Sequence, residues 1–360
     1  MVGLIGLGAS VFILSYLGVW GTRYLAERHE ILDIPNERSS HTHSVPRGGG
    51  LAIVLLTLGG LWIYISYNSL SNRWSFLAYT LGAMLIVAIS WLDDLGSQPN
   101  WLRFAVHSIG ALLAIYAFGY LNVGSLISAN PGVSRFLGFT ITFFWIVGLT
   151  NAYNFMDGID GIAGGQALVA GIGWTAIGWL DGQSHIVVFG LLLAATNLGF
   201  LFHNWSPARI FMGDVGSAFL GYSFAVLPLM LSSQSTGRTG FKLALAAILP
   251  VWPFVFDSTF TILRRLRRGE NVFIAHRSHL YQRLVIAGYT HGSVSLLYCA
   301  LALVGAIFAV GWMLHLRNIA LTALIVLPLI WLILWIFVTK QEQKQARQLA
   351  TPQSPFVDPV

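Results

Sequence analysis

Charge is the scarcest property of this chain: 9% of its 360 residues are charged, and only 14 are Asp or Glu. An average soluble domain carries roughly 25% charged residues. Hydrophobic residues make up 56% of the sequence, which is more apolar surface than a water-soluble core can bury. These values exclude an ordinary soluble protein and predict an integral membrane protein.

Cysteine is also scarce. Cys299 is the single cysteine and lies inside an apolar segment, which excludes an intrachain disulfide and favours a packing role over a reactive thiol. Internal repeats and paired broken helices are absent from the sequence, which counts against an inverted-repeat transporter. No basic residue precedes the first apolar segment, so we interpret that segment as a retained helix rather than a signal peptide.

Eleven apolar segments are long enough to form membrane helices, which need about 20 residues each. We expect them near residues 2–21, 48–67, 75–92, 101–121, 137–152, 162–181, 186–203, 215–233, 241–262, 292–314 and 319–338. The short loops predict one all-α, polytopic bundle of about 11 transmembrane helices over residues 1–338. A polar, disordered, cytoplasmic tail is expected over residues 339–360.

The distribution of Lys and Arg predicts the orientation of this bundle. With the amino terminus outside, 15 of the 20 Lys and Arg residues fall on one face. The positive-inside rule makes that face cytoplasmic, with the amino terminus in the periplasm and the carboxyl terminus in the cytoplasm. The net charge of +6 suits anionic headgroups or phosphates. Membrane lipids are therefore expected partners, and nucleic acid is not.

Five of the 14 acidic residues fall in three short motifs at the ends of apolar segments. Acids near hydrocarbon usually bind metal, substrate or protons. In the first motif, Asp93 and Asp94 directly follow one segment, and two adjacent carboxylates repel each other, so a cation should lie nearby. A solvated helix end is the alternative to a metal- or phosphate-handling pair.

The second motif spans residues 154–161. Asn154, Asp157 and Asp160 are spaced by three residues, which predicts an amide and two carboxylates on one helical face. Gly158 and Gly161 would allow close approach of the backbone to a ligand. A purely structural loop is the alternative.

The third motif, at residues 204–217, is the most specific. Asp214 is expected at the entry to a membrane helix, between glycines. A hard oxygen ligand there suits Mg²⁺, which takes one or two carboxylates and leaves positions for phosphate oxygens and water. Asp214 could also cap the amino terminus of the helix, a role compatible with metal binding.

All three motifs are predicted to lie on the cytoplasmic face, and two basic loops lie on the same face. Beyond an arginine cluster that could serve only topology or headgroup contacts, His276, Arg277 and His279 could clamp a diphosphate. Three glycines at 48–50 could cradle phosphate with backbone N–H groups or allow close helix packing. Asp257 lies within a membrane segment, where a functional or pairing role is expected.

Together these motifs resemble those of the polyprenyl-phosphate N-acetylhexosamine-1-phosphate transferases, over about residues 38–283 and in the same order. The pattern Asn-x-x-Pro-Ala-x-x-Phe-Met-Gly-Asp-x-Gly-Ser at 204–217 is the most specific part. The resemblance implies a Mg²⁺-dependent phosphotransferase, with Mn²⁺ as a substitute. It would move a sugar-1-phosphate from a UDP-N-acetylhexosamine to undecaprenyl phosphate, releasing UMP and initiating O-antigen or other cell-envelope polysaccharide synthesis.

The resemblance also implies residue roles. Asp214 and Asn154 would be at the Mg²⁺ site, and Asp93 and Asp94 would be the catalytic acid pair. The substrate-binding residues would include Asp157 and Asp160 on the nucleotide side, His41 and Arg47 in the first loop, and His279, which matches the first histidine of a His-x-His-His loop. The chain departs from that loop pattern because Tyr281 and Gln282 replace its last two histidines.

The sequence of residues 275–282 resembles that of the family branch whose members start surface polysaccharides. The sugar in that branch would be N-acetylglucosamine, N-acetylfucosamine or N-acetylquinovosamine. We expect a bacterial inner-membrane enzyme with a cytoplasmic active site, and a homodimer as its assembly. A polytopic ion-coupled transporter is the alternative function, and a non-catalytic scaffold is a third interpretation.

Overall fold

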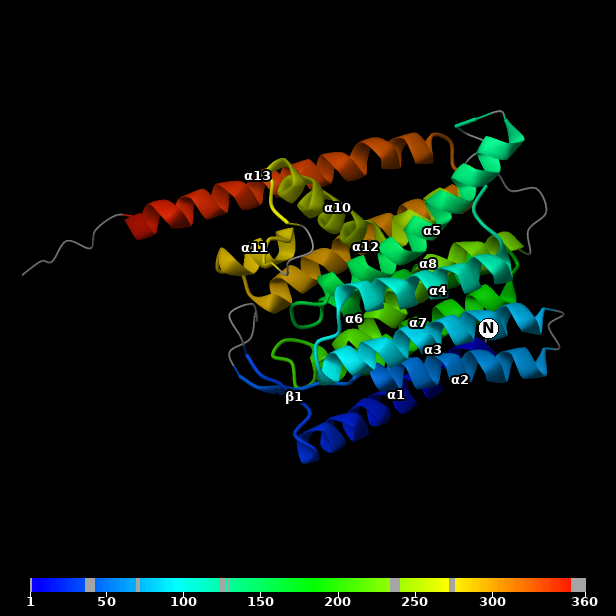
Figure 1. Cartoon of the computed structure of the whole chain (residues 1–360), viewed down its shortest axis with the longest axis horizontal. Coiled ribbons are helices and arrows are strands. Elements are labelled where there is room, and N and C mark those ends of the chain that lie inside the picture. The colour runs from blue at the N-terminus through cyan, green and yellow to red at the C-terminus, as the bar shows by residue number, and fades with distance from the viewer. Residues whose placement is uncertain are drawn as a thin grey trace, which may run out of the picture.

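The computed structural model describes residues 2–35, 43–68, 72–122, 127–128, 130–233, 240–271 and 276–350. Long helices lie side by side along one direction (Figure 1). Strands in the described residues are limited to β1 (Leu32–Asp33) and β2 (Val45–Pro46), which pair in antiparallel orientation with Leu32 opposite Pro46. The predicted all-α class is confirmed.

The described helices span most of these ranges. In chain order they are α1 (Val2–Arg28), α2 (Gly50–Tyr67), α3 (Arg73–Leu95), α4 (Asn100–Phe118), α5 (Pro131–Met156), α6 (Ile162–Leu180), α7 (Ser184–Asn204), α8 (Gly213–Ser233), α9 (Gly240–Ile248), α10 (Trp252–Arg267), α11 (Leu280–Ile286), α12 (His291–Met313) and α13 (Ile319–Ala350). A 3₁₀ turn, η2 (Leu249–Val251), connects α9 to α10.

In the described part of the chain, ten helical spans are long and apolar enough to cross a membrane, with 244–267 counted as one continuous span. Each corresponds to one expected segment. The remaining expected segment forms α6, but its five glycines and Gln166 lower its hydropathy. The protein is a polytopic helical membrane protein; the count of eleven spans and the predicted orientation stay predictions.

The core of the bundle lies around α6, α7 and α8. In the most apolar stretch of α8, 94% of the residues are buried inside the protein, against 17% in α1 and 22% in α13. Helix α8 packs against α3 and α5, and α6 packs against α7 and α12. The outer helices α1 and α13 leave side chains such as Leu17 and Leu324 exposed. Two of the helices that carry predicted site residues, α3 and α5, therefore both pack against a third, α8.

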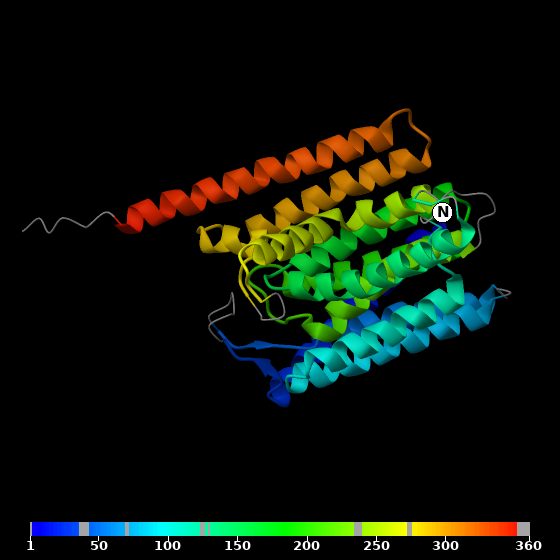
Figure 2. The same ribbon diagram turned by 45° about the horizontal axis from the view of Figure 1, so that its top comes forward.

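Helix α13 continues beyond the predicted end of the last span, reaching past α12 (Figure 2). The disorder predicted for residues 339–360 is wrong as far as Ala350, and residues 351–360 lie outside the described residues. The sequence after Val338 is rich in Lys, Gln, Glu and Ala, which are good helix formers. Arg283 of α11 also donates to both carboxylate oxygens of Glu342, at 2.7 and 2.6 Å.

Candidate active site

The three aspartate motifs meet at one end of the bundle. Asp93 and Asp94 lie in the last turn of α3, Asn154 lies in the last turn of α5, and α8 begins at Gly213. Helices α3 and α5 run toward this end and α8 runs away from it, so segments distant in sequence come together. The prediction that the motifs share one face is confirmed, and its cytoplasmic location stays a prediction.

Asp94 caps the amino terminus of α8. Its carboxylate accepts the backbone N–H groups of Asp214 at 3.0 Å and Val215 at 3.4 Å. Such groups have no partner within the helix, and the helix dipole favours a negative charge beside them. Gly213 has a φ of +76°, and a Cβ there would lie 2.6 Å from Asp94 Oδ2. Asp94 therefore supplies the cap that we considered for Asp214.

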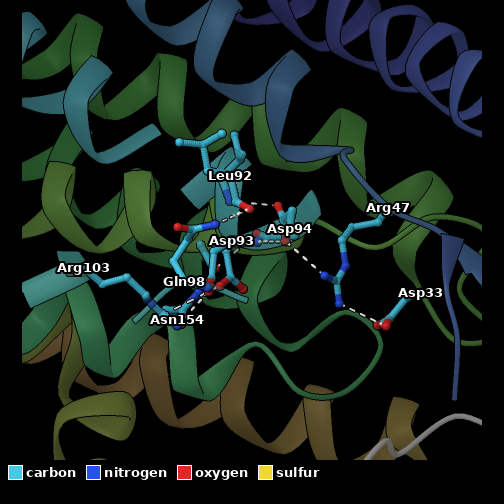
Figure 3. A network of polar contacts seen from close by, with 12 residues as sticks. Asp33, Arg47, Leu92, Asp93, Asp94, Gln98, Arg103 and Asn154 are labelled. Atoms are coloured by element: carbon cyan, nitrogen blue, oxygen red, sulfur yellow. Dashed lines mark hydrogen bonds and ion pairs between the residues drawn. The ribbon is translucent and has the colours of Figure 1, made fainter. Parts of the chain in front are cut away.

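Two arginines balance the aspartate pair (Figure 3). Arg47 lies between Asp94 and Asp33, with its Nη1 3.2 Å from Asp94 and its Nη2 3.0 Å from Asp33. Arg103 Nη1 lies 2.7 Å from Asp93 Oδ2. Burial lowers the pKa of Arg47, but the charges of Asp94 and Asp33 outweigh this effect and raise it. The prediction of a cation beside the pair is confirmed.

Arg103 also reaches the two residues predicted to bind Mg²⁺. Its Nη2 donates to Asn154 Oδ1 at 2.9 Å and lies 3.8 Å from Asp214 Oδ2. The amide of Asn154 is oriented by its bond to Ser217 Oγ at 3.0 Å. We assigned no role to Arg103 or Ser217 from the sequence. The feature of the sequence that could have indicated a role for Arg103 is a basic side chain in the first turn of an apolar helix.

Negative charge dominates where these segments meet. Burial, together with the charges of Asp214 and Asp94, raises the pKa of Asp157 to about 8. We call Asp93, Asp94, Asp157 and Asp214 the acidic cluster. Asp94 has a side chain only 2% exposed, whereas that of Asp214 is 31% exposed. Asp214 is therefore the better placed of the two to meet a ligand.

The acidic cluster fits a divalent cation by the chemistry of its donors. Within the described residues, no group of three or more His, Cys, Asp or Glu side chains is arranged to hold a metal ion. Mg²⁺ needs only one or two carboxylates, because waters and phosphate oxygens complete its octahedron. A carboxylate on Asp214 and an amide oxygen on Asn154 meet that need, with the carboxyl groups of Asp94 and Asp157 nearby.

The second motif does not form one helical face, so that prediction is wrong. Helix α5 ends at Met156, and Asp157 has φ −85° and ψ 60°. Gly161 has a φ of +78°, a conformation that suits glycine and not a continuing helix. Asp157 and Asp160 consequently lie in a turn.

Asp160 is bound within the protein. Its Oδ2 accepts the N–H of Ala208 at 3.2 Å, and its Oδ1 lies 3.3 Å from His291 Nδ1. Burial raises the pKa of Asp160, but the hydrogen bond and charge of His291 outweigh this and lower it. Asn204 fixes the same turn by accepting the N–H of Gly161 at 2.9 Å. The nucleotide-side role of Asp160 stays a prediction.

The glycines at the start of α2 serve close packing. The N–H groups of Gly49 and Gly50 donate to the main-chain carbonyls of residues 211–212 at 3.0 and 2.9 Å. A Cβ on Gly50 would lie 2.5 Å from the backbone of Gly216. The packing alternative is confirmed, and these two N–H groups are not free for phosphate. The same pairing places Arg47 at the acidic cluster, whereas His41 lies outside the described residues.

The later loop, residues 276–279 (the basic loop), is anchored on Asp257. His279 Nδ1 lies 3.3 Å from Asp257 Oδ1, and the rings of His276 and His279 stack with centroids 5.1 Å apart. Asp257 therefore has the pairing role expected for an intramembrane acid. Among the contacts of described residues, none joins His276, Arg277 or His279 to Asp214, so their diphosphate role stays a prediction.

Comparison with known proteins agrees with this arrangement. The sequence profile of glycosyl transferase family 4 matches residues 76–232, which hold all three aspartate motifs. A probable undecaprenyl-phosphate N-acetylglucosaminyl 1-phosphate transferase of Bacillus subtilis (strain 168) is 33% identical over 83% of this chain and 82% of its own length.

Two further relatives are similar over most of the chain. The decaprenyl-phosphate N-acetylglucosaminephosphotransferase of Mycobacterium tuberculosis (strain CDC 1551 / Oshkosh) is 29% identical over 82% of this chain and 78% of its own length. The undecaprenyl-phosphate alpha-N-acetylglucosaminyl 1-phosphate transferase of Escherichia coli (strain K12) is 28% identical over 78% and 76%.

The protein is a helical membrane bundle with acids and arginines gathered at one end, and its sequence is similar to those of these relatives. It is therefore a membrane-embedded sugar-phosphate transferase. More narrowly, the chain belongs to glycosyl transferase family 4, the superfamily of polyprenyl-phosphate N-acetylhexosamine-1-phosphate transferases. The resemblance noted from the motifs is confirmed.

Proposed function

We propose that the protein transfers the sugar-1-phosphate of a UDP-N-acetylhexosamine to undecaprenyl phosphate. An oxygen of the lipid phosphate attacks the phosphorus next to the sugar, the bond between the two phosphates breaks, and UMP leaves. The names of the three relatives each include a polyprenyl phosphate and N-acetylglucosamine, which supports this acceptor and this class of sugar. The acidic cluster is the observation that carries the proposal.

Charge neutralisation and in-line placement should dominate the barrier, because both reactants are anionic. Asp214 and Asn154 would hold Mg²⁺, or Mn²⁺ in its place, which acts as a Lewis acid and a template for the diphosphate when bound. Arg103 contacts the side-chain oxygens of Asn154 and Asp214 that would bind the metal, so its guanidinium is placed to meet phosphate oxygens there. Arg47 would hold phosphate oxygens from the side of the first loop.

Asp93 and Asp94 fit a positioning role better than that of a general base. Asp94 engages α8 and Arg47 with its oxygens. Asp93 binds Arg103 and accepts the N–H of Gln98 at 2.6 Å. A phosphate monoester has a second pKa of about 6 and is mostly dianionic at neutral pH, so the acceptor needs no base.

The positioning role predicts the pH dependence of the variants. For Asp93→Asn and Asp94→Asn, log kcat should be flat and parallel to wild type between about pH 6 and 9. Recovery of either variant at high pH would point to a base instead.

The predicted location follows from the charges and the substrates. We place the site at the cytoplasmic face of the bacterial inner membrane, because 15 of 20 Lys and Arg residues fall on that side of the expected topology. A nucleotide sugar reaches this face from water, and an isoprenoid lipid enters laterally between helices. The sequence of residues 275–282 supports a role in starting the synthesis of O-antigen or another surface polysaccharide. N-acetylglucosamine, N-acetylfucosamine and N-acetylquinovosamine are the candidate sugars.

An ion-coupled transporter is not favoured. It requires acids distributed across the depth of the membrane, whereas the acidic cluster lies at one end of α3, α5 and α8. The relatives are also named as transferases.

The proposal is tested by UMP release from purified protein given Mg²⁺, undecaprenyl phosphate and a panel of UDP-N-acetylhexosamines. Release that requires the lipid would support the reaction and identify the sugar. Folded protein that releases no UMP with any of these donors, or with a crude nucleotide-sugar extract, would contradict it.

A further inference from the structure

Tyr281 occupies a position where the His-x-His-His loop pattern of the family has a histidine. Its surroundings are those of a structural side chain. Its side chain is fully buried, and its hydroxyl donates to the carbonyl oxygen of Phe155 at 3.1 Å. Burial raises the pKa of Tyr281 well above its usual value, so the phenol stays a neutral donor at physiological pH. Its neighbour Gln282 is also engaged, since its Oε1 accepts the N–H of His279 at 3.2 Å.

The partner of Tyr281 belongs to the turn that carries Asp157. Phe155 lies in the last turn of α5, and Gly158 follows in the same turn; we call residues 155–158 the acid turn. A Cβ on Gly158 would overlap the hydroxyl of Tyr281 and lie 3.1 Å from its Cζ. Gly158 does not have a positive φ. The requirement for glycine here therefore comes from the close approach of Tyr281.

The other side of Tyr281 is fixed by Asp257. The carboxylate of Asp257 accepts the N–H groups of Leu280 at 2.8 Å and Tyr281 at 3.2 Å. It also accepts the hydroxyl of Tyr298 at 2.5 Å. The ring of Tyr281 stacks on that of His279 with centroids 5.8 Å apart and an interplanar angle of 25°. One side chain thus contacts both the basic loop and the acid turn.

We propose that Tyr281 is a positioning residue that sets the distance between the basic loop and the acid turn, so that both meet the same nucleotide-sugar diphosphate. The inference rests on the proposed function, because it assigns the two segments to one substrate. Loss of the hydroxyl should therefore weaken binding of the nucleotide sugar and leave the lipid acceptor unaffected.

Tyr281→Phe removes the hydroxyl and keeps the stacked ring. The KM for the UDP-sugar should rise about three- to tenfold, the effect of one hydrogen bond, with the KM for undecaprenyl phosphate and the Tm near wild type. Tyr79→Phe is the matched control, because it removes a buried hydroxyl bonded to Ser223 at 2.7 Å, and it should change neither KM. Wild-type KM values for Tyr281→Phe, or an equal rise in both with a lower Tm, would overturn the proposal.

Gly158→Ala tests the contact from the other side. The added methyl group should raise the KM for the UDP-sugar in the wild-type background, because it meets the Tyr281 hydroxyl. In the Tyr281→Phe background the same change should have a smaller effect, since the nearest ring atom is then 3.1 Å away. An equal effect in both backgrounds would mean that the two residues do not interact, which contradicts the proposal.

Hydrogen exchange separates this inference from the transferase reaction, because it needs no substrate. Tyr281→Phe should speed amide exchange in peptides covering residues 152–161 and 276–283, and Tyr79→Phe should not. No change in either peptide would overturn the proposal even if the wild type is active. A wild type that releases no UMP would contradict the proposed function and, with it, the shared substrate.

Discussion

The acidic cluster and the basic loop are built in opposite ways. The cluster is assembled from three helix ends, those of α3, α5 and α8, which are held together by arginines from the first loop and α4. The basic loop is one continuous stretch, anchored by the contact of His279 with Asp257 and by the stacking of His279 on Tyr281, which is bonded to Phe155. Burial, together with the charges of Asp214 and Asp94, raises the pKa of Asp157, so a second anion in the cluster is costly. The proposed function therefore assigns the cation to the cluster, whereas the loop is already held in place.

The largest effect should come from removing the exposed acid of the cluster. Asp214→Ala should lower UMP release by at least about a hundredfold, since loss of even an indirect metal partner weakens such sites about 10–100-fold. Asp181→Ala is the control, because Asp181 follows α6 and bonds Gln183. Activity of Asp214→Ala within about tenfold of wild type, in folded protein, would contradict the role of the cluster.

A smaller effect is expected for Asp94→Asn. The change keeps the size of the side chain but removes the charge that pairs with Arg47 and caps α8, so kcat should fall about 10–100-fold. Among the described residues, Asp33 contacts Arg47 but no member of the acidic cluster, so Asp33→Asn should lower kcat less. Equal losses in the two variants, measured by UMP release, would mean that the charge of Asp94 beside Arg47 and α8 contributes no more than the more distant charge of Asp33.

Asp157 should make stability depend on pH when no divalent cation is present. The pKa of Asp157 is raised from 3.8 to about 8, so ionisation destabilises the folded protein. With a chelator present, Asp157→Asn and wild type should have the same Tm near pH 4. As pH rises toward about 8, the Tm of the wild type should fall below that of Asp157→Asn. Above that pH the difference in Tm should stay constant. A difference in Tm that does not vary with pH would contradict the raised pKa of Asp157.

The smallest effect concerns the anchoring of the segment after the basic loop. Glu342→Gln removes the carboxylate that pairs with Arg283, whose side chain is only 9% exposed. The Tm should fall because a largely buried charge loses its partner. Glu270→Gln breaks the pair with Arg265, which has similar exposed fractions but a longer separation of 3.2 Å, against 2.7 and 2.6 Å for the two Arg283–Glu342 contacts. It should lower the Tm less, since short bidentate pairs are the stronger ones. The reverse order in thermal unfolding would contradict this anchoring.

The sequence was sufficient to predict the helical segments and the meeting of the aspartate motifs. Membrane helices require continuous apolar runs, and charge near their ends shows which loops share a face. Hydropathy marks only the part of a helix that lies in lipid, however. It therefore missed the continuation of α13 to Ala350, which depends on helix propensity and on Glu342.

The contacts within the site could not be predicted, because they depend on how the helices pack. The capping of α8 by Asp94 requires α3 and α8 to lie side by side. Likewise, Asp160 faces His291 only because α5 stops at Met156. Arg103 was visible as a basic residue in an apolar segment, but its three partners come from α3, α5 and α8.

Binding of a divalent cation by the acidic cluster is tested most directly by Mn²⁺ titration of purified protein, with free Mn²⁺ followed by electron paramagnetic resonance in the presence of a UDP-sugar. Wild type and Tyr79→Phe should bind Mn²⁺ in equal stoichiometry, and Asp214→Ala should lose that binding. Equal binding by wild type and Asp214→Ala would contradict a cation site at Asp214.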